Sequence, residues 1–253
     1  MIATTLPAAE GVIDFGNLQE INGGLSVRDC PGLTSLIGSQ IGRITGELTL
    51  INVTRLALLG FPRLTEVDFL TLNEVPDIGG LDFSAEGKDA TGLTVTETVI
   101  IIDTLLPSLG PLNLRNVSTL AMWNNTAMET ISLPLQVVRE KINIKSEGKV
   151  EFPLLPIANN ITLRDVSSVS LPALTSVSDF LASGNITRYA TSLQRKDVSS
   201  PFYFSAWTCP KSQTQRISKS NPQTPHSTAQ SSMEHITKHS SQGPTNVWER
   251  IKC

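Results

Sequence analysis

Two histidines near the end of the chain have a spacing that could bind a metal ion. His235 and His239 are four residues apart, so a helix would place both on one face. The zinc-protease form of this motif needs a glutamate directly after the first histidine, and Ile236 stands there instead. Because no third ligand lies nearby in the sequence, we expect no metal site here, and no motif predicts a cofactor.

Carboxylates are the other groups that could carry chemistry, because β-helical enzymes that cleave polysaccharides use paired acids or calcium ligands. The candidates are scattered singly along the first 194 residues: Asp68, Asp82, Asp103 and Asp165. That part of the chain has no histidine to act as a base, no Gly-x-Ser-x-Gly and no phosphate-binding loop. We therefore predict no catalytic residue, and keep a β-helical polysaccharide lyase or hydrolase as the less favoured alternative.

Five asparagines stand in Asn-x-Ser/Thr sequons, the acceptors of N-linked glycans in exported proteins. They are Asn52, Asn116, Asn124, Asn160 and Asn185, and none follows residue 194. We predict them as glycosylation sites, and the alternative is an asparagine that caps a turn. A partly overlapping set is expected to stack at the bends between coils: Asn113, Asn116, Asn124, Asn125, Asn143, Asn159 and Asn160.

A repeat must position all of these side chains. The apolar-proline steps Leu133-Pro134, Phe152-Pro153 and Leu171-Pro172 recur with a period of about 19 residues, and a short β-type run follows each of them. Upstream, the run that begins at Ile21 recurs about 23 residues later at Ile44, and again less cleanly at Val67. Alternation of apolar and polar residues within each run is typical of strands with one buried face.

A period of roughly 20 residues indicates a solenoid, in which one coil buries its apolar side only when the next stacks on it. The predicted fold is an all-β, right-handed parallel β-helix or leucine-rich-repeat-like solenoid. About seven or eight coils fit between residues 20 and 190. Aromatic residues make up only 5% of the chain, so the core must be aliphatic.

The repeat and the charge both change near Leu193. Residues 1–194 carry 12 basic and 20 acidic side chains, whereas residues 195–253 carry 8 and 3. We place a solenoid domain at residues 10–193 and a basic, Ser/Thr/Gln-rich tail at residues 194–253, whose composition predicts disorder. The tail lacks the interleaved aromatic and basic residues of a nucleic-acid-binding segment, so no nucleic-acid partner is expected.

Neither the cysteines nor the apolar segments indicate a cell compartment. Cys30, Cys209 and Cys253 form no close pair and no metal-ligand pattern, and Cys30 could be free or bridged. The longest apolar run, Val99 to Ile102, has four residues against the roughly 20 that a membrane helix needs. The first residues lack the basic and apolar regions of a signal peptide.

The run Glu151-Phe-Pro-Leu-Leu-Pro-Ile-Ala-Asn-Asn-Ile-Thr-Leu-Arg-Asp-Val-Ser-Ser-Val-Ser-Leu-Pro-Ala-Leu-Thr-Ser-Val resembles the fungal cell-wall organisation family of glycosylphosphatidylinositol (GPI)-anchored glycoproteins. Blocks at Ile44 to Leu50, Leu58 to Val67 and Leu93 to Thr98 are similar to the family's preceding repeats, and the match covers roughly residues 10–190. The resemblance implies a receptor-L-domain-like solenoid at the fungal cell surface. It also implies wall polysaccharide or wall proteins as partners and no catalytic site.

The chain departs from this family at both ends. Family members begin with a secretory signal and a cysteine-bearing cap, and they end with a Ser/Thr-rich stalk and a hydrophobic anchor signal. This sequence begins within the repeats and ends in an unrelated basic segment. The interpretation is a truncated or misassembled gene model or a degenerate paralogue, and membrane association through the anchor would belong to intact family members only. A receptor-like module that binds a ligand or glycan remains the main alternative function.

Overall fold

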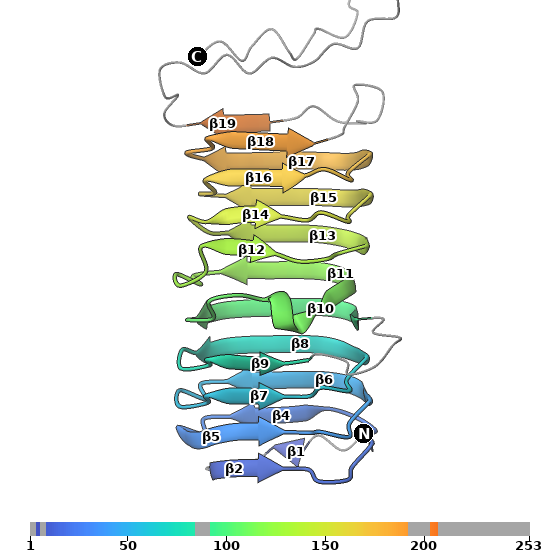
Figure 1. The fold of residues 1–253 in the computed structure, drawn as a ribbon, viewed down its shortest axis with the longest axis vertical. Helices are drawn as coiled ribbons and strands as arrows, with labels where there is room; N and C mark the ends of the chain where they lie inside the picture. The colour runs from blue at the N-terminus through green and yellow to red at the C-terminus, as the bar shows by residue number, and fades with distance from the viewer. Residues whose placement is uncertain (1–3, 6–8, 84–91, 192–202, 207–253) are drawn as a thin grey trace, which may run out of the picture. The chain divides into compact units, whose positions relative to one another are not determined.

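The computed structural model describes residues 4–5, 9–83, 92–191 and 203–206. These residues form parallel strands wound into a solenoid, so the fold class predicted from the repeats is confirmed. Eight long strands from β4 to β17 stack in chain order in the described part, and short strands lie in front of them in Figure 1. This agrees with the predicted seven or eight coils.

One large sheet contains the long strands. Its strands pair in parallel in the order β1 (Thr4–Thr5), β4 (Leu25–Arg28), β6 (Arg43–Ile51), β8 (Glu66–Val75), β10 (Leu93–Thr104), β11 (Leu114–Trp123), β13 (Val137–Lys145), β15 (Ile157–Arg164), β17 (Ser176–Gly184) and β19 (Tyr203–Ala206), and β3 (Glu20–Ile21) pairs with β6. Because β19 pairs with β17, the described β-structure includes a strand beyond residue 193.

The return side of the coils consists of two smaller parallel sheets. One contains β2 (Glu10–Asp14), β5 (Gly32–Ile37), β7 (Leu58–Gly60) and β9 (Gly80–Asp82), and the other contains β12 (Thr130–Ser132), β14 (Lys149–Glu151), β16 (Ser168–Leu171) and β18 (Arg188–Thr191). Between them the coil of β10 carries the 3-10 helix η1 (Gly110–Leu112) where the other coils have a short strand. The repeat therefore changes at this coil.

The strand register explains both periods. Ile21 lies opposite Ile44 and Ile44 lies opposite Val67, so the longer period of the N-terminal half is one full coil. In the C-terminal half Ile142 lies opposite Ile161 and Ile161 opposite Phe180, so the shorter period is one full coil there. Equivalent apolar residues stack in columns because each inward side chain must fill the same place in the coil above and below.

The apolar-proline steps form the turns that lead back to the long strands. In the turn that begins at Phe61, the backbone N–H of Leu64 donates to the Phe61 carbonyl at 3.1 Å, and Leu174 donates to Leu171 at 3.2 Å. Proline stands at the second position of each turn, where its fixed φ is favourable. In both of these turns the apolar residues at positions one and four are buried, whereas the step at Leu133 has the exposed Gln136 in the fourth position.

Aliphatic side chains dominate the core, as the composition predicted. Leu, Ile and Val fill most of the buried columns, and the aromatic residues Phe61, Phe83, Phe152 and Phe180 are exceptions. Phe61 and Phe83 occupy equivalent places in neighbouring coils, with ring centroids 6.1 Å apart. Cys30 is fully buried in the same core, and its thiol donates to the Arg28 carbonyl at 3.2 Å.

The expected stacking of asparagines at bends is only partly correct. Asn113 and Asn124 adopt left-handed backbone conformations at bends, and Asn125 begins a turn. Four others lie inside long strands, because an outward position of a parallel sheet accepts a polar side chain as readily as a bend does: Asn116, Asn143, Asn159 and Asn160.

Three predictions fall on residues that the structure does not describe: the histidine pair His235 and His239, the cysteines Cys209 and Cys253, and nearly all of the tail at residues 194–253. Among the described residues, no helix has the length and apolar character needed to cross a membrane.

Candidate functional site

A column of left-handed residues marks the corner at which each long strand ends. Strand register places these residues one above another: Asp29, Asn52, Glu74, Asp103, Asn124, Ser146, Asp165 and Gly184. All except Ser146 have positive φ, for example 52° at Asp29, 61° at Asp165 and 132° at Gly184. We call this column the corner ladder. Asp and Asn suit it because their short polar side chains tolerate this conformation.

Side chains of the corner ladder bond to one another between coils. Asn52 Nδ2 donates to Asp29 Oδ1 at 2.8 Å, and Asn124 Nδ2 donates in the same way to Asp103 Oδ1. Farther along, Lys145 Nζ lies 3.7 Å from Asp165 Oδ2. Since both members of that ion pair are more than half exposed, it contributes little to stability and leaves these groups accessible to a ligand.

A groove of about 840 Å³ opens on the C-terminal half of this ladder. It is lined by Asp103, by the corner after β11, by the corner after β13, and by Asp165 and Ser167. Trp123 lies at its edge with 38% of the residue exposed, at an outward position between Ile102 and Lys145 of the neighbouring strands. The groove is therefore polar along the ladder and aromatic at one side.

Corners of unequal length border the groove. Six residues, 124–129, join β11 to β12, whereas three residues join β13 to β14 and three join β15 to β16. The groove lies where the six-residue corner meets the three-residue ones. Gly148 keeps the two corners in contact, because a Cβ there would lie 2.5 Å from the Glu129 carbonyl oxygen.

The groove contains both signs of charge, with acids in excess. Four carboxylates line it, from Asp103, Glu129, Glu147 and Asp165, together with the two ammonium groups of Lys145 and Lys149. Carboxylates accept hydrogen bonds, ammonium groups donate them, and the Asn124 amide can do both. The lining thus offers both donors and acceptors around one aromatic surface.

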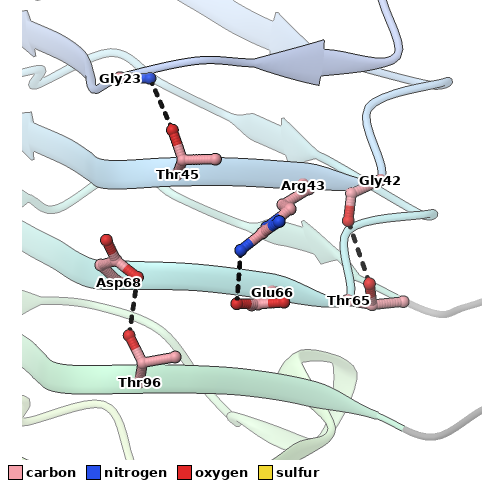
Figure 2. A network of polar contacts seen from close by, with 8 residues as sticks. All are labelled: Gly23, Gly42, Arg43, Thr45, Thr65, Glu66, Asp68 and Thr96. Atoms are coloured by element: carbon pink, nitrogen blue, oxygen red, sulfur yellow. Dashed lines mark hydrogen bonds and ion pairs between the residues drawn. The ribbon is translucent and has the colours of Figure 1, made fainter. Parts of the chain in front are cut away.

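The carboxylates singled out in the sequence have different environments. Asp68 belongs to a network between coils, shown in Figure 2, in which Thr96 Oγ1 donates to Asp68 Oδ1 at 2.7 Å. Arg43 and Glu66 form a neighbouring pair at 3.2 Å. Asp82 ends β9 and is not part of the groove lining. Of the four candidates, Asp103 and Asp165 line the groove.

Other bonds in Figure 2 also join one coil to the next. Gly23 N donates to Thr45 Oγ1 at 2.9 Å, and Thr65 Oγ1 donates to the Gly42 carbonyl at 3.1 Å. These partners are 22 and 23 residues apart, one coil length in this half of the chain. The network therefore fixes the register of neighbouring coils, and Asp68 is a structural member of it.

The five sequons fall on two surfaces. Asn52 and Asn124 are on the corner ladder, and Asn185 follows Gly184 directly. Asn116 and Asn160 lie within β11 and β15, where Asn116 Nδ2 donates to Thr94 Oγ1 at 3.1 Å. Among the described residues, none of the sequon asparagines lies in a short strand.

Sequence reasoning missed Trp123, Lys145, Glu129 and Glu147 as parts of one site. Trp123 stands in a strand position that is polar or aliphatic in the neighbouring coils, and this is the one signal that the sequence offers. In the described part of the chain no three His, Cys, Asp or Glu side chains gather in a way that could hold a metal ion.

Comparison with known proteins identifies fungal relatives. The chain is 30% identical over 168 residues to Protein ecm33 of Aspergillus fumigatus, covering 65% of this chain and 41% of that protein. It is 30% identical over 170 residues to Cell wall mannoprotein PST1 of Saccharomyces cerevisiae (66% and 37%), and 28% identical over 164 residues to Cell surface GPI-anchored protein ECM33 of Candida albicans (63% and 38%).

The chain thus spans about two fifths of the length of these curated relatives. No protein-family model matches the chain. No solved structure matches it either. The similarities confirm the resemblance that the repeats indicated: the sequence is related to fungal cell-wall proteins.

Proposed function

We propose that this chain is a non-enzymatic cell-surface glycoprotein that contributes to the organisation of the fungal cell wall. Its partners would be wall polysaccharides or other wall proteins, bound by the outward faces of the solenoid. The fold and the relatives together support the proposal. The described residues form a stack of parallel coils, and the relatives are named as wall and cell-surface proteins.

The two ladder acids in the groove, Asp103 and Asp165, are not spaced as a catalytic pair. Asp103 and Asp165 are three strands apart in the sheet order, since β11 and β13 lie between β10 and β15. At a strand spacing of about 4.8 Å, this places the two corners about 14 Å apart. Glycosidases of the common types hold their two carboxyl groups about 5–10 Å apart.

The sequons support an exported, glycosylated protein. We propose that Asn52, Asn116, Asn124, Asn160 and Asn185 carry N-linked glycans, which agrees with the name mannoprotein of one relative. The three asparagines at or beside the corner ladder are at least partly exposed, so a glycan can be attached to each of them. Localisation at the cell surface or wall follows, with membrane attachment through an anchor in longer relatives such as the GPI-anchored protein of Candida albicans.

The test is to place the full chain behind a secretion signal in a yeast and to fractionate culture medium, membranes and washed walls. We expect the chain in the wall fraction, with a mass that falls after enzymatic removal of N-linked glycans. Purified chain should sediment with insoluble β-glucan, chitin or mannoprotein-containing walls and should release no reducing sugar from them. Recovery only in the medium, with no binding to any wall polymer, would overturn the proposal.

A further inference from the structure

The groove beside Trp123 has the features of a site for a sugar chain. A pyranose ring has an apolar face of C–H groups and a polar edge of hydroxyls. Trp123 offers an exposed ring to the first, and Asn124, Lys145 and Asp165 offer donors and acceptors to the second. A volume of about 840 Å³ is within the range of pockets that take small ligands.

The charge of the groove favours neutral sugars over acidic ones. Four carboxylates face two ammonium groups along the lining, so a polyanion such as a uronic-acid polymer would be repelled. A neutral hexose chain needs no counter-charge, and its vicinal hydroxyls can donate to carboxylates and accept from Lys145 and the Asn124 amide.

A second observation points to the same chemistry. Asn124 is itself the acceptor of a sequon, so the groove contains an atom at which a sugar would be attached. Transfer of a glycan from a lipid-linked oligosaccharide diphosphate joins Nδ2 to sugar C1, breaks the bond from C1 to the phosphate and removes one Nδ2 proton. The remaining N–H can keep the hydrogen bond to Asp103 Oδ1.

We propose that this groove holds a chain of neutral sugar rings stacked on Trp123, supplied either by the glycan on Asn124 or by a strand of wall polysaccharide. The proposal rests on the proposed wall function for the second source only. It assigns Trp123 as the stacking residue, with Lys145, Glu147 and Asp165 as hydrogen-bonding residues on the neighbouring coils.

The polysaccharide source is tested with unglycosylated full chain made in bacteria. Binding to insoluble β-1,3-glucan and chitin is measured by co-sedimentation, and binding to mannan by affinity electrophoresis. Trp123→Ala should weaken binding roughly tenfold, as expected for loss of one well-placed aromatic contact. Phe69→Ala is the matched control, because Phe69 is 44% exposed on the same sheet but does not line the groove. Glu147→Arg, in an exposed corner, should weaken binding without altering Trp123.

The attached-glycan source is tested with glycosylated full chain from yeast. Release of the Asn124 glycan by an endoglycosidase under native conditions is followed by peptide mass spectrometry. Trp123→Ala should speed this release at least severalfold, and Phe69→Ala should not. Thr126→Ala removes the sequon and keeps Asn124, so it should restore polysaccharide binding to glycosylated chain if the attached glycan fills the groove.

An effect of Trp123→Ala in either assay supports the groove and identifies its source of sugar. If Trp123→Ala behaves as Phe69→Ala in both assays, the proposal is wrong, even where the wild-type chain binds the wall. If the wild-type chain binds no wall polymer but Trp123 protects the attached glycan, the wall function fails and the groove stands.

Discussion

A buried polar pair at the corner of two adjacent coils provides a sharp test of how this solenoid is stabilised. The column next to the corner ladder contains Cys30, Val53, Val75 and Val166, all fully buried, but Thr104 and Asn125 occupy it in the coils of β10 and β11, and the exposed Glu147 occupies it in the coil of β13. Asn125 Oδ1 accepts from Thr104 N at 3.1 Å and from Thr104 Oγ1 at 2.7 Å. Asn125 Nδ2 donates to the Ile101 carbonyl at 2.9 Å.

Asn125→Ala removes all three bonds from groups that are buried, since Thr104 is 0% and Asn125 6% exposed. Each buried polar group without a partner costs about 1–3 kcal/mol, and partial relaxation lowers the sum, so we expect a loss of about 3–5 kcal/mol. That is a large part of the roughly 5–15 kcal/mol that typically stabilises a folded domain. Thr104→Val alone should cost about 1 kcal/mol.

The double variant Thr104→Val/Asn125→Val distinguishes pairing from simple loss of volume. It replaces the buried polar pair by apolar side chains like Val53, Val75 and Val166, so it should be less destabilised than the sum of the single valine variants by roughly 1–2 kcal/mol. The assay is urea unfolding of the full chain followed by far-ultraviolet circular dichroism. The control is Asn159→Ala, because the Asn159 amide also donates to a backbone carbonyl but does so at an exposed strand position. An Asn125→Ala stability within about 0.5 kcal/mol of the wild type, or additive valine variants, would refute the reasoning.

Three further changes test the corner and the core by the same unfolding assay. Gly148→Ala should cost about 1–3 kcal/mol because its Cβ would lie 2.5 Å from the Glu129 carbonyl oxygen, and an unchanged midpoint would contradict the close contact. Asp165→Val should cost about 1–2 kcal/mol, because a β-branched residue is strained at the φ of 61° found there, whereas Asp165→Gly should be near neutral. Equal effects of the two variants would argue against a left-handed corner. Phe152→Ala should cost about 3–5 kcal/mol, and a loss below about 1 kcal/mol would show that the side chain is not buried between its neighbours.

The sequence predicts the stack of coils well because every coil must bury its apolar side chains and close its turn in the same way. One inward column contains Ile142, Ile161 and Phe180. Proline follows both Phe152 and Leu171, at the second position of a turn. Volume and turn geometry leave few residue types for these positions, so the period appears in the sequence.

The corner ladder could not be found in the same way. The successive rungs Asp29, Asn52, Glu74, Asp103 and Asn124 are unequally spaced along the sequence, because bulges and coil lengths differ between levels. No fixed period relates them, and each acid resembles an isolated surface residue. Only the strand register shows that they form one column.

The groove lies at a departure from the repeat, so a search of the sequence for the repeat does not find it. A solenoid with identical corners would present the same profile at every level, and no hollow would arise between one corner and the next. The six-residue corner after Trp123 stands beside three-residue corners, and the groove lies at this difference in length. A change in corner length does not by itself predict the groove, because three residues also join β4 to β5 and six join β6 to β7. What distinguishes the corner after β11 is Trp123 and the sequon at Asn124, both of which line the groove.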